Sequence, residues 1–217
     1  MESFSKDDLQ GNTVGSLSAT QHAVLIGSLL GDGTLRRQGT RINALFEVNH
    51  AWKSRGYVDW KYKIFQSYVL TPPKRRRGNG LRVAYRFTTR SLPVFTNYYE
   101  WFYQNRVKRI PADLHLTELA LAVWYMDDGC KSRSSCYLNT QQFVRNDQEL
   151  LRHLLKRDFD INSTLNKDKQ YFQIRVTTDS TARLCKLISP NLLDCFRYKL
   201  ADDPVTTEPK GEALVNC

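Results

Sequence analysis

The sequence lacks the residue patterns that zinc and disulfide sites require. Its five cysteines are odd in number and include no Cys-x-x-Cys pair, so they indicate neither a zinc knuckle nor a disulfide framework. The histidines give no better signal, because all four, His22, His50, His115 and His153, are scattered along the chain. A histidine-centred metal site is therefore not expected.

Long apolar runs are also missing. No stretch approaches the roughly 20 residues of a membrane-spanning helix, and the first ten residues, MESFSKDDLQ, are too acidic and polar for a signal or transit peptide. We expect a protein that acts where it is made or enters a compartment by another route. With 217 residues, 41% of them apolar, the chain can form one large domain or two small halves.

Acidic residues are scarce in one sector of the chain. The protein has 32 Lys and Arg against 22 Asp and Glu, a formal net charge of +10 and a pI near 9.4. Between Lys53 and Arg109 lie 14 Lys or Arg against only Asp59 and Glu100, so this sector holds the whole positive excess. Because aromatic residues interleave with these cations, the sector predicts a surface that faces a polyanion such as nucleic acid. A solvated charged face is the alternative.

An internal repeat links the two halves of the chain. The segments LIGSLLGDG (25–33) and LAVWYMDDG (121–129) both pass from apolar residues into Asp-Gly, and they place Asp32 and Asp128 at equivalent positions 96 residues apart. Further landmarks recur in the same order at similar offsets, namely Thr89 and Thr178 at the ends of YRFTT and IRVTT, and then Lys108 and Lys199. Shared order with small offset differences indicates a duplication with loop insertions.

Each repeat begins with a predicted helix. Ser18 and Gln21 form a capping-box signature ahead of AVLIGSLL, and Thr117 can cap ELALAVWYM. Both segments are apolar nearly all round, so we expect both helices to be buried. Gly27 and Gly31, four residues apart, would let another backbone approach the first helix closely.

Strand patterns of period two follow each helix. Apolar residues alternate with polar ones in RINALFEV (Ile42, Ala44, Phe46 and Val48 inward), LRVAYRFTTR (Leu81, Val83, Tyr85 and Phe87 inward) and QYFQIRVTT (Phe172, Ile174 and Val176 inward). RSSCYLNTQ presents Arg133, Tyr137, Asn139 and Gln141 on one side. Helical stretches follow the hairpins, so each half is predicted to run helix, two strands, helix, two strands, helix, an α+β fold.

The polar sides of these strands predict contacts to DNA. Arg, Asn and Gln have the geometry to bond base edges in the major groove, although plain solvation is the alternative. The segment TPPKRRRGNG is predicted to be a loop, which suits phosphates better than bases. The candidate DNA-binding residues are Arg36, Arg37, Arg41, Asn43, Lys74, Arg75, Arg76, Arg77, Arg82, Arg86, Arg133, Asn139, Gln141, Gln173 and Arg175.

The two repeated acids predict a metal site. Asp32 and Asp128 each fall at a helix C-terminus, where the backbone is already partly negative, so an acid there needs a cation. If the two helices pack side by side, the acids meet, and hard divalent ions make that tolerable. Gly33 and Gly129 would end the helices with a left-handed residue. Oxygen ligands without useful His or Cys favour Mg²⁺ over zinc; an ordinary Gly-Asp-Gly turn is the alternative for either copy taken alone.

The paired nonapeptides resemble the LAGLIDADG motif, and the chain resembles the single-chain LAGLIDADG homing endonucleases of the omega-intron type. The resemblance covers roughly residues 20 to 200 and includes, in order, GSLLGDG, VLTPPKRR, IPADL ahead of LAVWYMDDG, YLNTQQF and YKL. Two motif helices with these intervening landmarks are far more specific than one.

The resemblance implies a pseudo-twofold pair of αββαββα halves, packed through the motif helices, whose antiparallel sheets form a saddle over double-stranded DNA. It divides the chain into an N-terminal tail (1–17), a first half (18–112), a second half (113–200) and a C-terminal tail (201–217). It also implies metal-dependent cutting of both strands of a long, rare target. Asp32 and Asp128 would be metal ligands, and the main-chain carbonyls of Gly31 and Asp127 would be further ligands. Lys108 and Lys199 would lie beside the attacking water.

The two motifs are not identical, which bears on the target. Ser28 and Leu29 occupy the middle of the first motif, whereas Trp124 and Tyr125 occupy the middle of the second. Such asymmetry suits one chain that forms both halves, so a monomer and a non-palindromic target are expected. A typical member of the family works in a mitochondrion or chloroplast; the nucleus or cytoplasm is the other option.

Two rival functions share this scaffold. An RNA-binding maturase that assists splicing of its host intron is possible, because basic saddles also bind RNA. It does not need both acids, so retention of Asp32, Asp128, Lys108 and Lys199 favours cleavage, with a bifunctional protein left open. A transcriptional regulator would have lost the acids and gained a helix-turn-helix segment, which we do not find.

Overall fold

The computed structural model describes residues 16–78 and 82–200 of the chain. They form two compact units that divide between Trp101 and Phe102. This division lies ahead of the half boundary at residue 112 that the resemblance implies. The hairpin after the division belongs to the second unit because Arg109, which follows it, forms a two-pronged ion pair with Asp147 of that unit (Nε–Oδ2 2.8 Å, Nη2–Oδ1 3.2 Å).

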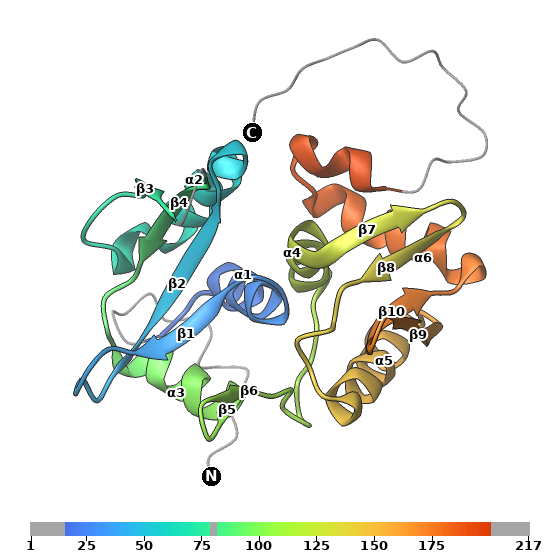
Figure 1. Cartoon of the computed structure of the whole chain (residues 1–217), viewed down its shortest axis with the longest axis horizontal. Helices are drawn as coiled ribbons and strands as arrows, with labels where there is room; N and C mark the ends of the chain where they lie inside the picture. Colours follow the sequence, from blue (N-terminus) through green and yellow to red (C-terminus); the bar gives the residue numbers. More distant parts are fainter. Residues whose placement is uncertain (1–15, 79–81, 201–217) are drawn as a thin grey trace. The chain divides into compact units, whose positions relative to one another are not determined.

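The first unit contains one four-stranded antiparallel sheet and three α-helices (Figure 1). Its elements are α1 (Ala19–Leu30), β1 (Thr34–Arg37), β2 (Ala44–Ala51), the 3-10 turn η2 (Trp52–Ser54), α2 (Arg55–Phe65), η3 (Gln66–Tyr68), β3 (Lys74–Arg77), β4 (Val83–Thr88) and α3 (Pro93–Phe102). The strands lie in the order β1-β2-β4-β3.

The second unit repeats this plan (Figure 1). After the short hairpin β5 (Tyr103–Gln104) and β6 (Val107–Lys108) come α4 (Glu118–Asp128), β7 (Gly129–Ser132), β8 (Ser135–Leu138), α5 (Arg145–Phe159), β9 (Ser163–Asp168), β10 (Tyr171–Val176), α6 (Thr178–Ile188), η4 (Ser189–Asn191) and η5 (Asp194–Lys199). The strand order is β7-β8-β10-β9. The predicted α+β fold with αββαββα halves is therefore confirmed.

Each sheet has one face covered by helices and one that is not. In the first unit Phe46 packs against Phe65 of α2, and Phe87 packs against Tyr62 of the same helix. We call the side of the sheet that packs on α2 the helix face and the opposite side the open face. Side chains alternate along a strand and paired residues share a face, so the register assigns every strand residue to one of these two faces. The same division applies to the second sheet, where Leu138 and Ile174 are fully buried.

The two repeated helices, α1 and α4, form as their sequences predict. The capping box of α1 is present, since Ser18 Oγ accepts from the Gln21 amide and Gln21 Oε1 accepts from the Ser18 amide. Thr117 caps α4 in the same way through the Ala120 amide. Residues 23–30 of α1 and 120–126 of α4 are all buried, as the all-round apolar pattern predicts.

The two motif glycines serve a purpose other than the predicted one. Gly129, the C-cap of α4, has an extended conformation (φ −78°, ψ 147°), and among the described glycines only Gly39 has a positive φ. The prediction of left-handed caps was therefore wrong. Space is the constraint instead, because a Cβ on Gly33 would lie 2.7 Å from Ser28 Cβ, and one on Gly129 would overlap the ring of Tyr125.

Three strand predictions need correction. Within TPPKRRRGNG, residues Lys74–Arg77 are not a loop but strand β3, which pairs with β4. The last two residues of that segment, and Leu81 of the next predicted strand, lie outside the described residues. The strand in RINALFEV starts at Ala44, so Ile42 lies in the preceding turn and is 82% exposed instead of packing inward. RSSCYLNTQ contains a turn at Arg133 (φ 50°) and a strand of only four residues, so Arg133 and Tyr137 do not share one strand.

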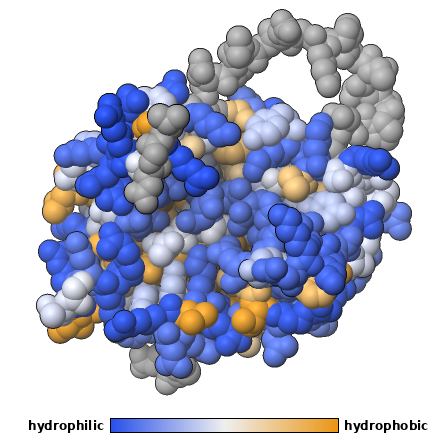
Figure 2. All heavy atoms as spheres, in the orientation of Figure 1, coloured by the Kyte–Doolittle hydropathy of each residue, from blue (hydrophilic) through white to orange (hydrophobic). Residues whose placement is uncertain are grey.

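Hydrophilic side chains cover most of the face shown in Figure 2, with isolated apolar residues among them. Among the described residues, no helix combines the length and apolar character needed to cross a bilayer.

Candidate functional site

Asp32 lies just beyond the end of α1. The helix closes when the Gly31 amide donates to the carbonyls of Gly27 and Ser28 (3.2 and 3.1 Å), and the Gly33 amide then donates to Ser28 (2.7 Å). This tight turn places Asp32 between the helix and β1, with half of its side chain (51%) exposed. The carboxylate is therefore held at the helix end and remains open to solvent or a ligand.

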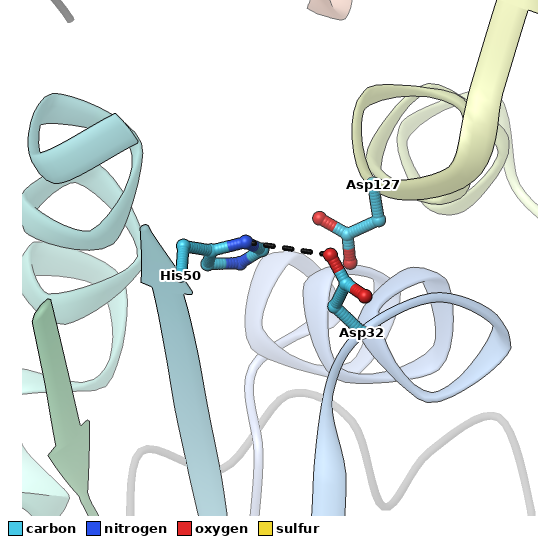
Figure 3. Close-up of side chains that lie close together, drawn as sticks. All are labelled: Asp32, His50 and Asp127. Atoms are coloured by element: carbon cyan, nitrogen blue, oxygen red, sulfur yellow. Dashed lines mark ion pairs between the residues drawn. The ribbon is translucent and has the colours of Figure 1, made fainter. Parts of the chain in front are cut away.

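His50 of β2 contacts this carboxylate, which the scattered histidines of the sequence did not predict. Its Nδ1 lies 3.5 Å from Asp32 Oδ2 (Figure 3). The imidazole is itself held by a tilted contact with Tyr57 of α2, at 5.1 Å between ring centroids. Only pairing of β2 with β1 brings His50 to Asp32, so no local sequence signal could have identified it. A cavity of about 820 Å³ adjoins both residues and is also lined by Asn49, Arg82 and Ala84.

The second repeat ends differently, because α4 continues through both of its acids. Asp127 and Asp128 are the last two residues of the helix, and both are half-buried (Figure 3 labels Asp127 there). Gln142 Nε2 lies 3.5 Å from Asp128 Oδ2, and the Asp128 carbonyl accepts from the Asn139 amide at 3.0 Å. The turn after β8 thus borders the predicted metal ligand.

Lys199 reaches the same helix end. Its Nζ donates to the carbonyls of Met126 (2.7 Å) and Asp127 (3.4 Å). Its own carbonyl accepts from the Tyr125 hydroxyl (2.7 Å), whose pKa is raised by burial and by the nearby Cys136. An ammonium at the C-terminus of a helix complements the helix dipole. The structure therefore places one of the two predicted lysines at the motif of its own unit.

Lys108, the other predicted lysine, lies in strand β6 and pairs with Tyr103. It is half-buried. Its catalytic role beside the attacking water remains a prediction.

The open face of the first sheet carries cations around one acid. Arg36 donates to Glu47 Oε2 through Nε (3.2 Å) and Nη2 (2.8 Å), and Arg86 Nη1 lies 3.9 Å from the same oxygen. Lys74 and Arg76 lie on this face because they pair with Arg86 and Ala84. Glu47 is not among the residues predicted from the sequence to contact DNA, which are all Arg, Lys, Asn or Gln.

Several other predicted DNA-binding residues lie off this face. Arg37 stacks on Tyr99 and bonds to Glu100 (2.6 Å), both in α3. Arg75 and Arg77 pair with Tyr85 and Val83 and so lie on the helix face. The remaining candidates of this unit precede strands, Arg41 and Asn43 before β2 and Arg82 before β4.

The open face of the second sheet carries amides and hydroxyls together with one cation, Arg175, and one acid, Asp168. Arg175 Nε donates to Ser135 Oγ (3.2 Å), and Asn166 Nδ2 lies 3.5 Å from the Tyr137 hydroxyl. Gln141 donates to Asp168 (3.0 Å) and lies 3.4 Å from Gln173 Oε1. The structure thus brings Gln141, Gln173 and Arg175 to one sheet, whereas Arg133 lies in the turn between β7 and β8.

Comparisons with known proteins agree with this arrangement. The profile of the LAGLIDADG DNA endonuclease family matches residues 22–184. The probable intron-encoded endonuclease 1 of Wickerhamomyces canadensis is 29% identical over 200 residues, which cover 85% of each chain. The solved structure of the homing endonuclease I-WcaI bound to its DNA recognition sequence is 26% identical, covers 94% of this chain and 96% of that chain, and has a TM-score of 0.80.

A further relative has a different name. The cytochrome b mRNA maturase bI2 of Saccharomyces cerevisiae is 30% identical over 221 residues. The match covers 91% of this chain but only 51% of that protein, so the chain spans about half the length of the yeast maturase. The duplicated fold, the acid at the end of each motif helix and the family match over most of the sequence lead to one conclusion: this chain belongs to the LAGLIDADG DNA endonuclease family.

Proposed function

We propose that this endonuclease cuts both strands of a long, non-palindromic DNA target, by hydrolysis of one phosphodiester bond in each strand, and thereby starts the copying of its host intron into an empty allele. The observation that supports this most strongly is the acid at the end of each motif, Asp32 in the turn after α1 and Asp128 as the last residue of α4, each in a unit whose four-stranded sheet has an open face. One chain supplies both halves, so we propose that a monomer acts, in the mitochondrion or chloroplast.

The donors at the two helix ends fit a divalent cation, and we propose Mg²⁺. Asp32 offers a half-exposed carboxylate and Asp128 offers another, so the donor set is the hard oxygen type that Mg²⁺ prefers. The main-chain carbonyls of Gly31 and Asp127 would be the remaining protein ligands of the cation. The Asp127 carbonyl also accepts a long hydrogen bond from Lys199 (3.4 Å). When bound, the cation would lower the pKa of water and offset charge on the departing 3′ oxygen.

The chain's own cations supply the rest of the electrostatics. The Lys199 ammonium, held on the carbonyls of Met126 and Asp127, is positioned to orient water and to offset the charge that builds up on the attacked phosphate. We propose that Lys108 does the same for the other strand. His50 holds the Asp32 carboxylate in one orientation through its Nδ1. No covalent link between protein and DNA is needed.

Recognition is assigned to the two open faces. In the first unit Arg36, Arg86, Lys74 and Arg76 would contact bases and phosphates, with Arg82 and Asn49 beside the acid. In the second unit Gln173, Gln141 and Arg175 would bond base edges, with Asn139 next to the motif end. Because the two sets of side chains differ, the two half-sites should differ in sequence.

The experiment that tests this function is incubation of the purified protein with Mg²⁺ and either a randomised duplex library or the intron-minus version of the host gene. Sequencing of the cut ends should give breaks in both strands at one long site. The Asp32→Asn protein, prepared in parallel, controls for contaminating nucleases. Failure of the wild-type protein to cut either substrate would contradict the proposal.

A maturase role is the second candidate, and the observation that favours it is the 30% identity to the yeast bI2 maturase. A purified protein that binds its intron RNA tightly and never cuts DNA would decide for that role. Cutting together with RNA binding would establish a bifunctional protein.

A further inference from the structure

The basic strand β3 presents its cations on two opposite faces of the first sheet. The register pairs Lys74 with Arg86 and Arg76 with Ala84, which places both on the open face. It pairs Arg75 with Tyr85, which lies on the helix face because its hydroxyl donates to Asp59 of α2 (3.0 Å). The four exposed cations of β3 therefore lie on two surfaces. Lys74 and Arg76 can contact a duplex that is bound to the open face, whereas Arg75 lies on the opposite side of the sheet.

An exposed tryptophan lies at the centre of the second surface. The guanidinium of Arg75 lies 5.2 Å from the Trp52 ring centroid, and that of Arg55 lies 5.5 Å from it. Tyr85 meets the same ring edge-on at 5.2 Å. Trp52 is 37% exposed despite these contacts. We call this group, Trp52, Arg55, Arg75 and Tyr85, the outer cluster.

The outer cluster carries two guanidinium groups on one indole. Among the described contacts, the acid that meets the cluster is Asp59, which accepts from the Tyr85 hydroxyl. One carboxylate offsets only one of the two positive charges, so the cluster suits an anionic ligand. A guanidinium that lies over an aromatic ring keeps N–H groups with which it can bond phosphate oxygens in pairs.

Free phosphate has no flat surface that could cover the exposed ring of Trp52. Exposed aromatic rings between basic side chains are how proteins bind unpaired bases, by stacking on them while cations hold the backbone. A duplex docked on the open face cannot turn around the edge of the sheet, since double-stranded DNA is stiff over about 50 nm. A single strand bends freely and can reach the helix face.

We propose that the outer cluster is a second nucleic-acid site, which binds a single strand of RNA or DNA through base stacking on Trp52 and phosphate contacts of Arg75 and Arg55. This site is separate from the open face that binds the duplex target. It gives the endonuclease a way to hold an unpaired strand while the open face is occupied.

Neighbouring arginines of β3 provide a matched pair of variants. Arg75→Gln and Arg76→Gln remove the same charge from adjacent, exposed residues on opposite faces of one strand. Binding is measured by fluorescence anisotropy of the full chain with labelled single-stranded RNA, single-stranded DNA of the same sequence, and the duplex, each at two salt concentrations. The wild-type affinities for RNA and DNA strands show which of the two the site prefers.

We expect Arg75→Gln to weaken single-strand binding about five- to tenfold and to affect the single strand more than the duplex. Arg76→Gln should show the reverse order. Trp52→Phe, which keeps an aromatic ring of smaller stacking area, should also weaken single-strand binding. Thermal melting identifies a variant that has lost its fold, and Arg55→Gln, which removes the other guanidinium of the outer cluster, then replaces Arg75→Gln.

The proposal is overturned if the two arginine variants lose equal single-strand affinity, because the attraction would then be non-specific. It is also overturned if Arg75→Gln weakens the duplex as much as the single strand, or if no single strand binds the wild-type protein. None of these outcomes requires the wild-type protein to stop cutting duplex DNA, so they are distinct from a failure of the nuclease function.

Discussion

The two units have the same topology but different chemistry at equivalent places. The open face of the first sheet carries four strand cations, Arg36, Lys74, Arg76 and Arg86, around Glu47, whereas the strands of the second open face carry one cation, Arg175, and one acid, Asp168, among amides and hydroxyls. At the motif ends, Asp32 lies in a turn against His50, whereas Asp128 ends a helix that Lys199 caps. Duplication therefore preserved the scaffold while the contacts diverged.

This difference indicates how the two half-sites are bound. The first unit should attract DNA mainly through phosphate charge, which depends strongly on salt. The second should bind mainly through directed hydrogen bonds to bases, which depend less on salt. A target bound in these two ways cannot be symmetric.

The largest expected effect is the loss of double-strand cutting when the acid of either motif is neutralised. Asp32→Asn and Asp128→Asn should each abolish double-strand cutting while DNA binding persists, because a neutral amide cannot replace a carboxylate ligand. Asp127→Asn keeps the main-chain carbonyl and should retain far more cutting than Asp128→Asn. Plasmid linearisation measures cutting and gel shift measures binding; more activity in Asp128→Asn than in Asp127→Asn would contradict the assignment.

The lysines give the next effect. Lys199→Ala removes the ammonium at the end of α4 and should slow cutting roughly 10²- to 10³-fold without changing the target. Lys108→Ala should slow cutting of the other strand if that lysine acts equivalently. Strand-specific single-turnover rates on an end-labelled duplex measure both. A shifted target preference for Lys199→Ala would mean that it contacts bases and has been misplaced.

Glu47 offers a sharper test of the first open face. An acid on a DNA-binding face is costly unless it accepts from a base amino group or orients the neighbouring arginines. Glu47→Gln should change base preference by roughly tenfold at one or two adjacent positions of the target. Sequencing of cut products from a library measures this. A uniform loss across all positions would show that Glu47 reads no base.

A salt titration compares the two sheets directly. Lys74→Gln should reduce the slope of log affinity against log salt by about 1, whereas Gln173→Ala should weaken binding with little change in slope. Equal slope changes in the two variants would remove the distinction between the two faces.

The smallest expected effect concerns the support of α4. Burial raises the pKa of Asp158, but the hydrogen bonds from Arg157 and the Leu116 amide outweigh this and hold the pKa below its usual range. Since Leu116 directly precedes the cap of α4, Asp158→Asn should cost about 1–3 kcal/mol of unfolding free energy. The carboxylate stabilises the fold above its ordinary pKa near 3.9, and this contribution is lost as the pH falls through the lower native pKa.

Thermal melting of wild type and Asp158→Asn at neutral and acid pH measures that effect. The two proteins should differ at neutral pH, and the difference should shrink as the pH falls below the ordinary carboxyl range and through the lower pKa of native Asp158. A difference that grows as the pH falls would contradict the sign of the shift.

Local patterns in the sequence predicted much of this fold. The capping box at Ser18 and Gln21 and the all-round apolar helices follow from interactions within a few residues, so sequence alone identified them. Strand β3 was missed because four consecutive cations have no apolar alternation, and only the free edge of β4 makes them a strand. The contacts of His50 and Glu47 depend on strand register, which no local pattern encodes.

We propose that the acids of both motifs bind the divalent cation used for cutting, and Mn²⁺ binding to the protein–DNA complex can be followed by electron paramagnetic resonance. The wild-type complex should bind Mn²⁺, and Asp32→Asn and Asp128→Asn should each weaken this binding strongly. Wild-type Mn²⁺ affinity in either variant would show that its acid is not a metal ligand.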